Sequence, residues 1–147
     1  MTTDQTGRMD AGLLKDTEAL RRFADAYTAA WCSRNAASVA AFYAEDGSLQ
    51  VNDAPAAVGR AAITEVAQSF MTAFPDMHVL LDELRIEDGF ALYHWTLVGT
   101  NTGPGGTGRA VRISGYEVWQ ISADGLIARS QGHFDAEEYR RQLEAEA

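Results

Sequence analysis

The sequence predicts an α+β fold, with helices packed on one face of a mostly antiparallel sheet. Apolar residues recur at helical spacing in the first half of the chain and alternate at strand spacing in the second half. Helices dominate the first half and a series of antiparallel strands follows, which is typical of the α+β class. An antiparallel sheet can bury one face against such helices.

Three helices are predicted in the first half. The first covers about residues 14–33, where apolar residues repeat every three to four positions. Asn35 can cap a second, shorter helix that carries apolar residues as far as Tyr43. The third covers 61–74 and ends at Pro75, which cannot continue a helix. The apolar stripe of the first helix consists of Leu20, Phe23, Tyr27, Ala30 and Trp31.

The second half is predicted to form strands joined by short connections. Turn sequences stand at 87–89 and 123–125, and a glycine-rich hairpin loop stands at 101–108. Glu45-Asp46-Gly47 predicts a further turn, and Asp135 predicts the N-cap of a last helix. The expected strands are 48–52, 77–86, 90–100, 110–122 and 126–134, and the expected last helix is 135–144.

Length and composition indicate one domain. The chain has 147 residues, of which 46% are hydrophobic and 22% are charged, as in ordinary globular domains. Residues 1–12 are polar and lack the apolar segment of a signal peptide, so we expect a disordered tail there. Residues 13–147 are expected to form the domain.

The charge of the chain argues against two classes of partner. Twenty-one acidic residues against 12 basic ones give a net charge of −9. Such a surface repels phosphates, so neither nucleic acid nor membrane is expected as a partner. No apolar run approaches the roughly 20 residues of a membrane span. Cys32 is the only cysteine, which excludes an internal disulfide and is compatible with a cytoplasmic location.

Two patterns look like ligand motifs but lack essential parts. The glycines at 103–108 precede a predicted strand, whereas a phosphate loop needs a lysine and a following helix. His78, His94 and His133 lie far apart, without other ligands at metal-binding spacing. We therefore expect no metal and no cofactor.

Strand alternation singles out Glu117. This residue lies in the middle of the more apolar face of the strand at 110–122, together with Trp119. A buried carboxylate is costly unless it is paired, hydrogen-bonded or protonated, and a raised pKa suits a general acid or base. Two interpretations stay open. Glu117 is either catalytic, or it is structural, in a salt bridge with Arg60 or Arg129 or turned outward by a bulge.

Aromatic residues suggest an apolar pocket. Trp95 can line it if it points inward from the strand at 90–100. Aromatic residues at helical spacing are more often plain core, but buried hydroxyl and indole N–H groups need partners. The expected lining consists of Tyr27, Trp31, Phe74, Trp95 and Trp119.

The opposite face of the sheet is expected to form a homodimer interface. It is partly apolar, as an interface between subunits would be. The residues behind this expectation are His94, Val98, Tyr116 and Val118.

The order of short motifs is similar to that of the SnoaL-like polyketide cyclase family, within the nuclear-transport-factor-two-like superfamily. The resemblance covers roughly residues 15–143 and lies in the order and spacing of the motifs. They are Tyr27-x-x-x-Trp31, Phe42-Tyr43-Ala44-Glu45-Asp46, Gly59-Arg60-Ala61-Ala62-Ile63, Phe74-Pro75-Asp76-Met77-His78, Trp95-Thr96-Leu97-x-Gly99-Thr100 and Asp124-Gly125-Leu126-Ile127.

The resemblance implies a cone, in which a curved sheet wraps around the helices and encloses an apolar cavity. It also implies cofactor-independent ring closure by an aspartate in the last strand, whereas relatives of the same fold do other chemistry or only bind. This chain departs from that pattern, because the aspartate position falls on Gly132. A glycine can transfer no proton and would enlarge the cavity.

Two functions are therefore predicted. The first is a cofactor-independent cyclase, isomerase or lyase for a polyketide-like or other carbonyl-containing metabolite, with Glu117 or His78 as proton carrier. His133 could join them if a bulge turned it inward, and Tyr27 could donate a hydrogen bond to the ligand. The second is a non-catalytic module that binds an apolar small molecule and lacks the family's aspartate at Gly132.

Overall fold

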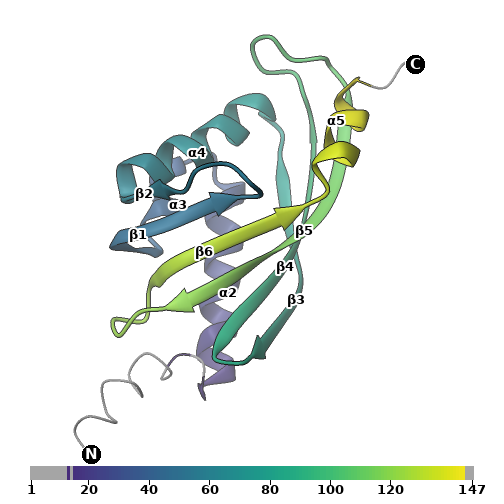
Figure 1. The fold of residues 1–147 in the computed structure, drawn as a ribbon. Helices are drawn as coiled ribbons and strands as arrows, with labels where there is room; N and C mark the ends of the chain where they lie inside the picture. The colour runs from purple at the N-terminus through teal and green to yellow at the C-terminus, as the bar shows by residue number, and fades with distance from the viewer. Residues whose placement is uncertain (1–12, 14, 145–147) are drawn as a thin grey trace, which may run out of the picture.

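The computed structural model describes residue 13 and residues 15–144 (Figure 1). The disordered tail predicted at residues 1–12 lies outside this part of the chain. The helices are α2 (Thr17–Cys32), α3 (Ala36–Ala40), α4 (Arg60–Ala73) and α5 (Ala136–Glu144). The strands are β1 (Tyr43–Val51), β2 (Ala57–Val58), β3 (His78–Glu87), β4 (Phe90–Thr100), β5 (Ala110–Ile121) and β6 (Ile127–Phe134).

The α+β prediction is confirmed. The strands form one curved sheet in the order β2-β1-β6-β5-β4-β3, which does not close on itself. All neighbouring strands are antiparallel except β1 and β6, which are parallel. Figure 1 shows α2 crossing behind the sheet, with α4 next to β1 and β2. The helices therefore share the inner face of the sheet, and the core lies between them.

The turn predicted at Glu45-Asp46-Gly47 is wrong, because β1 runs through these residues. The chain absorbs them as an irregularity in the pairing with β6 between Tyr43 and Ser48. A Cβ at Gly47 would lie only 2.8 Å from the carbonyl oxygen of Ile127, so only glycine allows this close approach. Tyr43, expected at the end of a helix, consequently starts the strand and points into the core.

Buried aromatic rings fill the space between α2 and the sheet. The α2 stripe buries Leu20, Tyr27 and Trp31 as its spacing predicts. Tyr93 of β4 stacks on Trp119 of β5, with centroids 4.9 Å apart and planes 18° apart. Tyr27 contacts this pair edge-on. Because burial of each large side chain contributes roughly 1.5–3 kcal/mol, these contacts fix α2 against the middle of the sheet.

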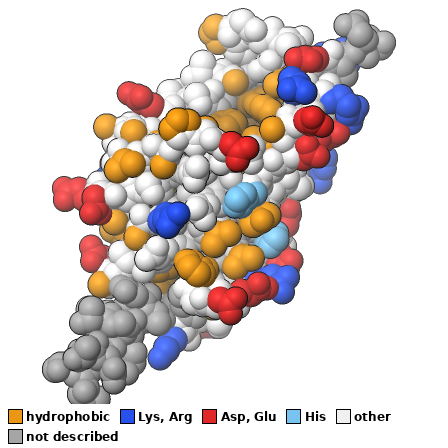
Figure 2. Space-filling model, in the orientation of Figure 1, with side chains coloured by type: hydrophobic (Ala, Val, Ile, Leu, Met, Phe, Trp, Pro, Cys, Tyr) orange, Lys and Arg blue, Asp and Glu red, His pale blue; other side chains and the backbone are white. Residues whose placement is uncertain are grey.

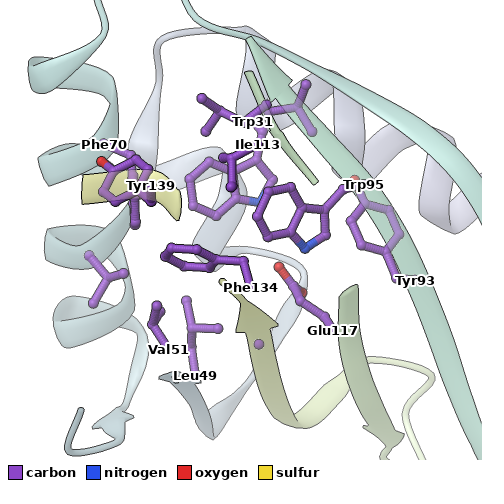
Figure 3. A pocket seen from close by; sticks show the side chains of 14 residues that line it. Trp31, Leu49, Val51, Phe70, Tyr93, Trp95, Ile113, Glu117, Phe134 and Tyr139 are labelled. Atoms are coloured by element: carbon purple, nitrogen blue, oxygen red, sulfur yellow. The ribbon is translucent and has the colours of Figure 1, made fainter. Parts of the chain in front are cut away.

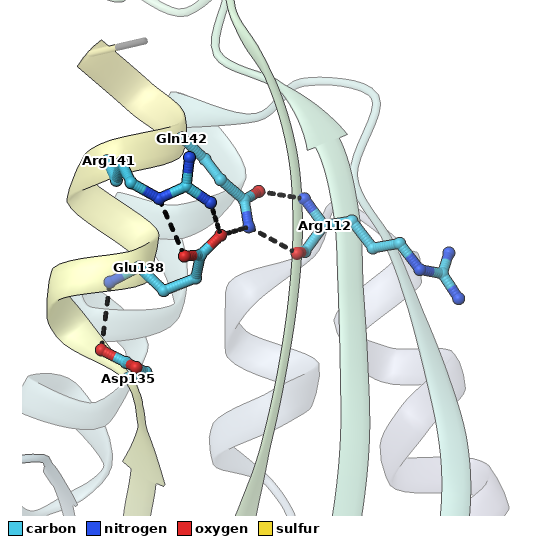
Figure 4. Close-up of polar contacts among 5 residues, drawn as sticks. All are labelled: Arg112, Asp135, Glu138, Arg141 and Gln142. Carbon is cyan, nitrogen blue, oxygen red and sulfur yellow. Dashed lines mark hydrogen bonds and ion pairs between the residues drawn. The ribbon is translucent and has the colours of Figure 1, made fainter.

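Helix α5 covers one end of the sheet through polar contacts (Figure 4). Asp135 caps it as predicted, since its Oδ1 accepts from the backbone N–H of Glu138 at 3.0 Å. The Gln142 side chain accepts from the backbone N–H of Arg112 at 2.7 Å and donates to its carbonyl at 2.9 Å. Gln142 thus takes the place of a neighbouring strand, because β6 pairs with β5 only from Gly115 onward.

We expect Gly115→Ala to lower the free energy of unfolding by about 1–3 kcal/mol. An added Cβ would lie 2.7 Å from Cζ2 of Trp95 and would also clash with the carbonyl of His133. Gly132→Ala on the adjacent strand is the matched control. Its Cβ would meet atoms no closer than 3.4 Å, so a neutral or slightly stabilising effect is expected. Denaturant unfolding of both variants measures the difference, and equal losses would contradict the packing argument.

Candidate functional site

A small, mostly apolar cavity lies between the inner face of the sheet, α2, α4 and α5 (Figure 3). Its volume is about 60 Å³. Among the described residues that line it, Glu117 is the only charged one. The aromatic lining is Trp31, Phe70, Tyr93, Trp95, Phe134 and Tyr139, and the rest is Leu49, Val51, Val66, Val79, Leu97, Ile113, Glu117 and Gly132.

The carboxyl group of Glu117 is held through one of its two oxygens. Its side chain points inward from β5, and the residue is 8% exposed. Oε1 accepts from the hydroxyl of Tyr27 at 3.0 Å, the indole N–H of Trp119 at 2.8 Å and the hydroxyl of Ser130 at 3.0 Å. No hydrogen bond from the described residues reaches Oε2. The three donors therefore fix the carboxyl and leave Oε2 as its free oxygen.

Burial raises the pKa of Glu117, and the hydrogen bonds from Trp119, Ser130 and Tyr27 lower it in part. With three donors directed at Oε1, a proton on the carboxyl resides on Oε2. The alternative of a salt bridge with Arg60 or Arg129 is not formed within the described part of the chain. Arg60 instead donates from Nε to the carbonyl of Tyr43 at 2.9 Å, and Arg129 is exposed. The group is thus a buried carboxyl suited to proton transfer.

A second tyrosine lies behind Glu117. The hydroxyls of Tyr27 and Tyr43 are 2.8 Å apart. Because the single hydroxyl proton of Tyr27 goes to Glu117, Tyr43 donates to Tyr27. Burial raises the pKa of both phenols well above the usual range, so both stay protonated as donors. Tyr27 is therefore occupied by Glu117 and does not donate to a ligand in this arrangement.

The structure brings together most of the predicted site residues. Trp31, Trp95, Gly132 and Glu117 line the cavity. Tyr27 and Trp119 lie behind the carboxyl of Glu117 and bind it, so they support the site without lining it.

The other predicted residues lie elsewhere. Phe74 is fully buried beside Tyr139, with ring centroids 6.3 Å apart, and does not line the cavity. His78 is exposed on β3 and is not part of the lining. His133 is exposed too, and its ring contacts Tyr116 on the outer face of the sheet. No bulge turns it inward, because the β5–β6 irregularity lies between Gln120 and Ile121.

Sequence reasoning missed Ser130 and Tyr43. Strand alternation could have found Ser130, because it lies two residues from Gly132 on the same face. Tyr43 carries no such signal, since its spacing from the preceding apolar residues fits the end of a helix.

Gly132 is the cross-strand partner of Glu117. A Cβ at Gly132 would lie 3.7 Å from Cγ of Glu117. The missing side chain thus leaves space directly beside the carboxyl. No group of three or more His, Cys, Asp or Glu residues within the described ranges could hold a metal ion.

Comparison with known proteins agrees with this architecture. The profile of the SnoaL-like domain matches residues 20–130. This chain belongs to the SnoaL-like family. Among curated proteins, no sequence matches it significantly. In the part of this SnoaL-like protein that the structure describes, no helix is long and apolar enough to cross a membrane.

Solved structures share the fold of this SnoaL-like protein. TsrD from Streptomyces laurentii is similar with a TM-score of 0.76 and 20% identity, over 89% of this chain and 98% of that one. A protein with a ketosteroid isomerase-like fold from Catenulispora acidiphila, in complex with trimethylamine, is similar with a TM-score of 0.73 and 15% identity, over 82% of this chain and 91% of that one. A putative SnoaL-like polyketide cyclase from Jannaschia has a TM-score of 0.69 and 15% identity, over 80% of this chain and 88% of that one. At these identities the similarity shows the fold, including the curved sheet.

We expect the stability of this SnoaL-like protein to reveal the raised pKa of Glu117. The folded state binds this proton more tightly than the unfolded state, so the contribution of Glu117 to stability is greatest below the ordinary carboxyl pKa. It falls as the pH rises through the folded-state pKa, by up to about 1.4 kcal/mol per pH unit. Glu117→Gln removes this contribution. The stability of the variant relative to the wild type should therefore rise with pH between the ordinary carboxyl pKa and the folded-state pKa of Glu117.

Denaturant unfolding at a series of pH values measures this difference. Glu65→Gln, at an exposed position of α4, is the control and should follow the wild type. A constant difference between Glu117→Gln and the wild type across the pH series would disprove the raised pKa.

Proposed function

We propose that this protein is a cofactor-independent enzyme that moves a proton on a small carbonyl-containing metabolite, with Glu117 as general acid and base. The supporting observation is that one charged residue lines the apolar cavity within the part of the chain that the structure describes. It is a buried carboxyl, held by three donors on one oxygen and open on the other. Carboxyl groups whose pKa is raised exchange protons effectively near neutral pH.

The proposed step is proton transfer at a carbon next to a carbonyl. Ionised Oε2 of Glu117 takes the proton, and the electron pair of the C–H bond moves into an enolate. The carboxylic acid then returns the proton to the same or another carbon, or to a leaving group. Atoms and charge balance without a cofactor. Reprotonation at another carbon is isomerisation, and loss of a leaving group is a lyase reaction.

The size of the cavity favours small substrates. Pockets for drug-sized ligands have volumes of roughly 300–1,000 Å³, whereas this cavity has about 60 Å³. A polyketide-like, polycyclic substrate would require the lining side chains to move apart. We therefore favour a short-chain or single-ring carbonyl compound over a polycyclic one.

The alternative is a non-catalytic binding module. Gly132 stands where the family resemblance implies an aspartate, and one carboxyl alone can serve as a binding group. A carboxylate among aromatic rings also suits a small organic cation, and the Catenulispora protein was solved with trimethylamine. This function predicts binding without conversion.

We further propose a homodimer through the outer face of the sheet. His94, Tyr116 and His133 form a row across β4, β5 and β6, with neighbouring ring centroids 5.4 and 4.9 Å apart. Val98 and Val118 are partly exposed beside this row. Figure 2 shows hydrophobic and histidine side chains gathered on this face. We also propose a cytoplasmic location, with which the single cysteine is compatible.

We expect the wild type to accelerate the exchange of the α-protons of cyclopentanone in D₂O. Proton NMR measures the rate of this exchange. Glu117→Gln should lower the protein-dependent rate about 100-fold or more, since a general base contributes roughly 10²–10⁴-fold. Glu65→Gln is the control and should keep the rate. Binding of cyclopentanone without accelerated exchange would favour the binding module, and equal rates for both variants would exclude Glu117 as the base.

Light scattering should give about twice the 16.0 kDa mass of one chain. Val118→Asp should shift the mass toward one chain, because it places a charge within the proposed interface. Val58→Asp is the control, since Val58 is 65% exposed on the edge strand β2. A monomeric wild type would contradict the dimer.

A further inference from the structure

We propose that the indole N–H of Trp95 binds the ligand's oxygen, so that the cavity selects small neutral molecules with one hydrogen-bond acceptor. This inference rests on the proposed function insofar as the cavity is a ligand site. It adds the group that recognises the ligand and the chemical class that fits. It also transfers to Trp95 the role that the sequence suggested for Tyr27.

The first observation is an unpaired buried donor. Two buried side-chain polar atoms within residue 13 and residues 15–144 have no hydrogen-bond partner, namely Nε2 of His94 and Nε1 of Trp95. His94 lies on the outer face of the sheet, whereas Trp95 lines the cavity. An unpaired buried donor costs roughly 1–3 kcal/mol. Such a cost in a cavity wall is explained if a ligand supplies the acceptor.

The second observation is that the surrounding structure fixes the Trp95 ring. Trp95 lies across from Gly115, and any Cβ there would be 2.7 Å from Cζ2 of the indole. Glycine within a strand is unfavourable by itself, yet it makes the room that this ring occupies. The ring of Phe134 packs edge-on against the indole, with centroids 5.9 Å apart. The donor is therefore preorganised and not free to seek a protein partner.

The third observation is that four other donors near the cavity already make hydrogen bonds within the protein. Tyr27, Trp119 and Ser130 all donate to Oε1 of Glu117. The hydroxyl of Tyr93 lies 2.6 Å from Oγ1 of Thr28. These bonds occupy four donors, whereas the buried N–H of Trp95 has no partner among the described residues and can donate to a bound molecule.

Trp95 and Glu117 then have complementary roles. Figure 3 shows the indole nitrogen on the side of Trp95 that faces the carboxyl of Glu117 within the cavity. A carbonyl oxygen that accepts from Trp95 would place the neighbouring carbon toward this carboxyl. The hydrogen bond strengthens when that oxygen gains charge as an enolate. An organic cation has no acceptor for the N–H and would meet the positive end of its dipole.

The test compares cyclopentanone with cyclopentane, which has a similar shape but no acceptor. Binding is followed by NMR of the indole N–H groups, and Trp95→Phe identifies the Trp95 resonance among the three tryptophans. We expect cyclopentanone to shift this resonance downfield and cyclopentane to leave it nearly unchanged. Trp95→Phe should lower the ratio of ketone to hydrocarbon affinity about tenfold, as one lost hydrogen bond implies.

The affinity ratio separates the lost N–H from a general change in cavity size, because both probes sense the same cavity. An unchanged ratio in Trp95→Phe, failure of cyclopentanone to bind, or displacement of the ketone by tetramethylammonium would overturn the inference. Catalysed α-exchange without a shift of Trp95 would refute this inference alone. A shift of Trp95 without exchange would refute proton transfer and leave the inference standing.

Discussion

The burial of one carboxyl group is the constraint on which the site depends. Glu117 lies in the middle of the sheet, where an isolated charge would be costly. Three donors from α2, β5 and β6 meet on its Oε1 and make its burial tolerable. The same bonds connect the helix to two strands at the centre of the core. Site and core therefore form one unit, in which the position of the carboxyl depends on the packing of Tyr27 and Trp119.

The distribution of polar groups gives the cavity a direction. One oxygen of Glu117 is satisfied by the protein, and the other is left to the cavity. The indole N–H of Trp95 is likewise left without a protein partner. Two incompletely paired groups in an otherwise apolar wall are more informative than the fold, which many unrelated activities share. They define where a ligand's polar atoms would have to lie.

Much of this could be predicted from the sequence, because periodicity depends on local geometry. The α2 stripe, the strands β3 to β6 and the place of Glu117 on the more apolar face of β5 all follow from spacing. The hydrogen bond from Tyr27 to Glu117 could not be predicted in the same way, since Tyr27 is 90 residues away in the chain. The β1 strand was misassigned because its turn-like sequence is absorbed by a close approach at Gly47, which only the pairing with β6 requires.

The relation between Glu117 and Gly132 bears on how a SnoaL-like protein could act without the expected aspartate. The two residues are partners across β5 and β6, so side chains at both positions point to the same space. A glutamate reaches further than an aspartate, and a glycine opposite leaves room for it, with 3.7 Å between Cγ and the position of a Cβ. The cavity therefore has a carboxyl on β5, although β6 has a glycine at the paired position. Carboxyl groups at both of these paired positions would raise each other's pKa. A glycine at one position therefore suits a carboxylate at the other.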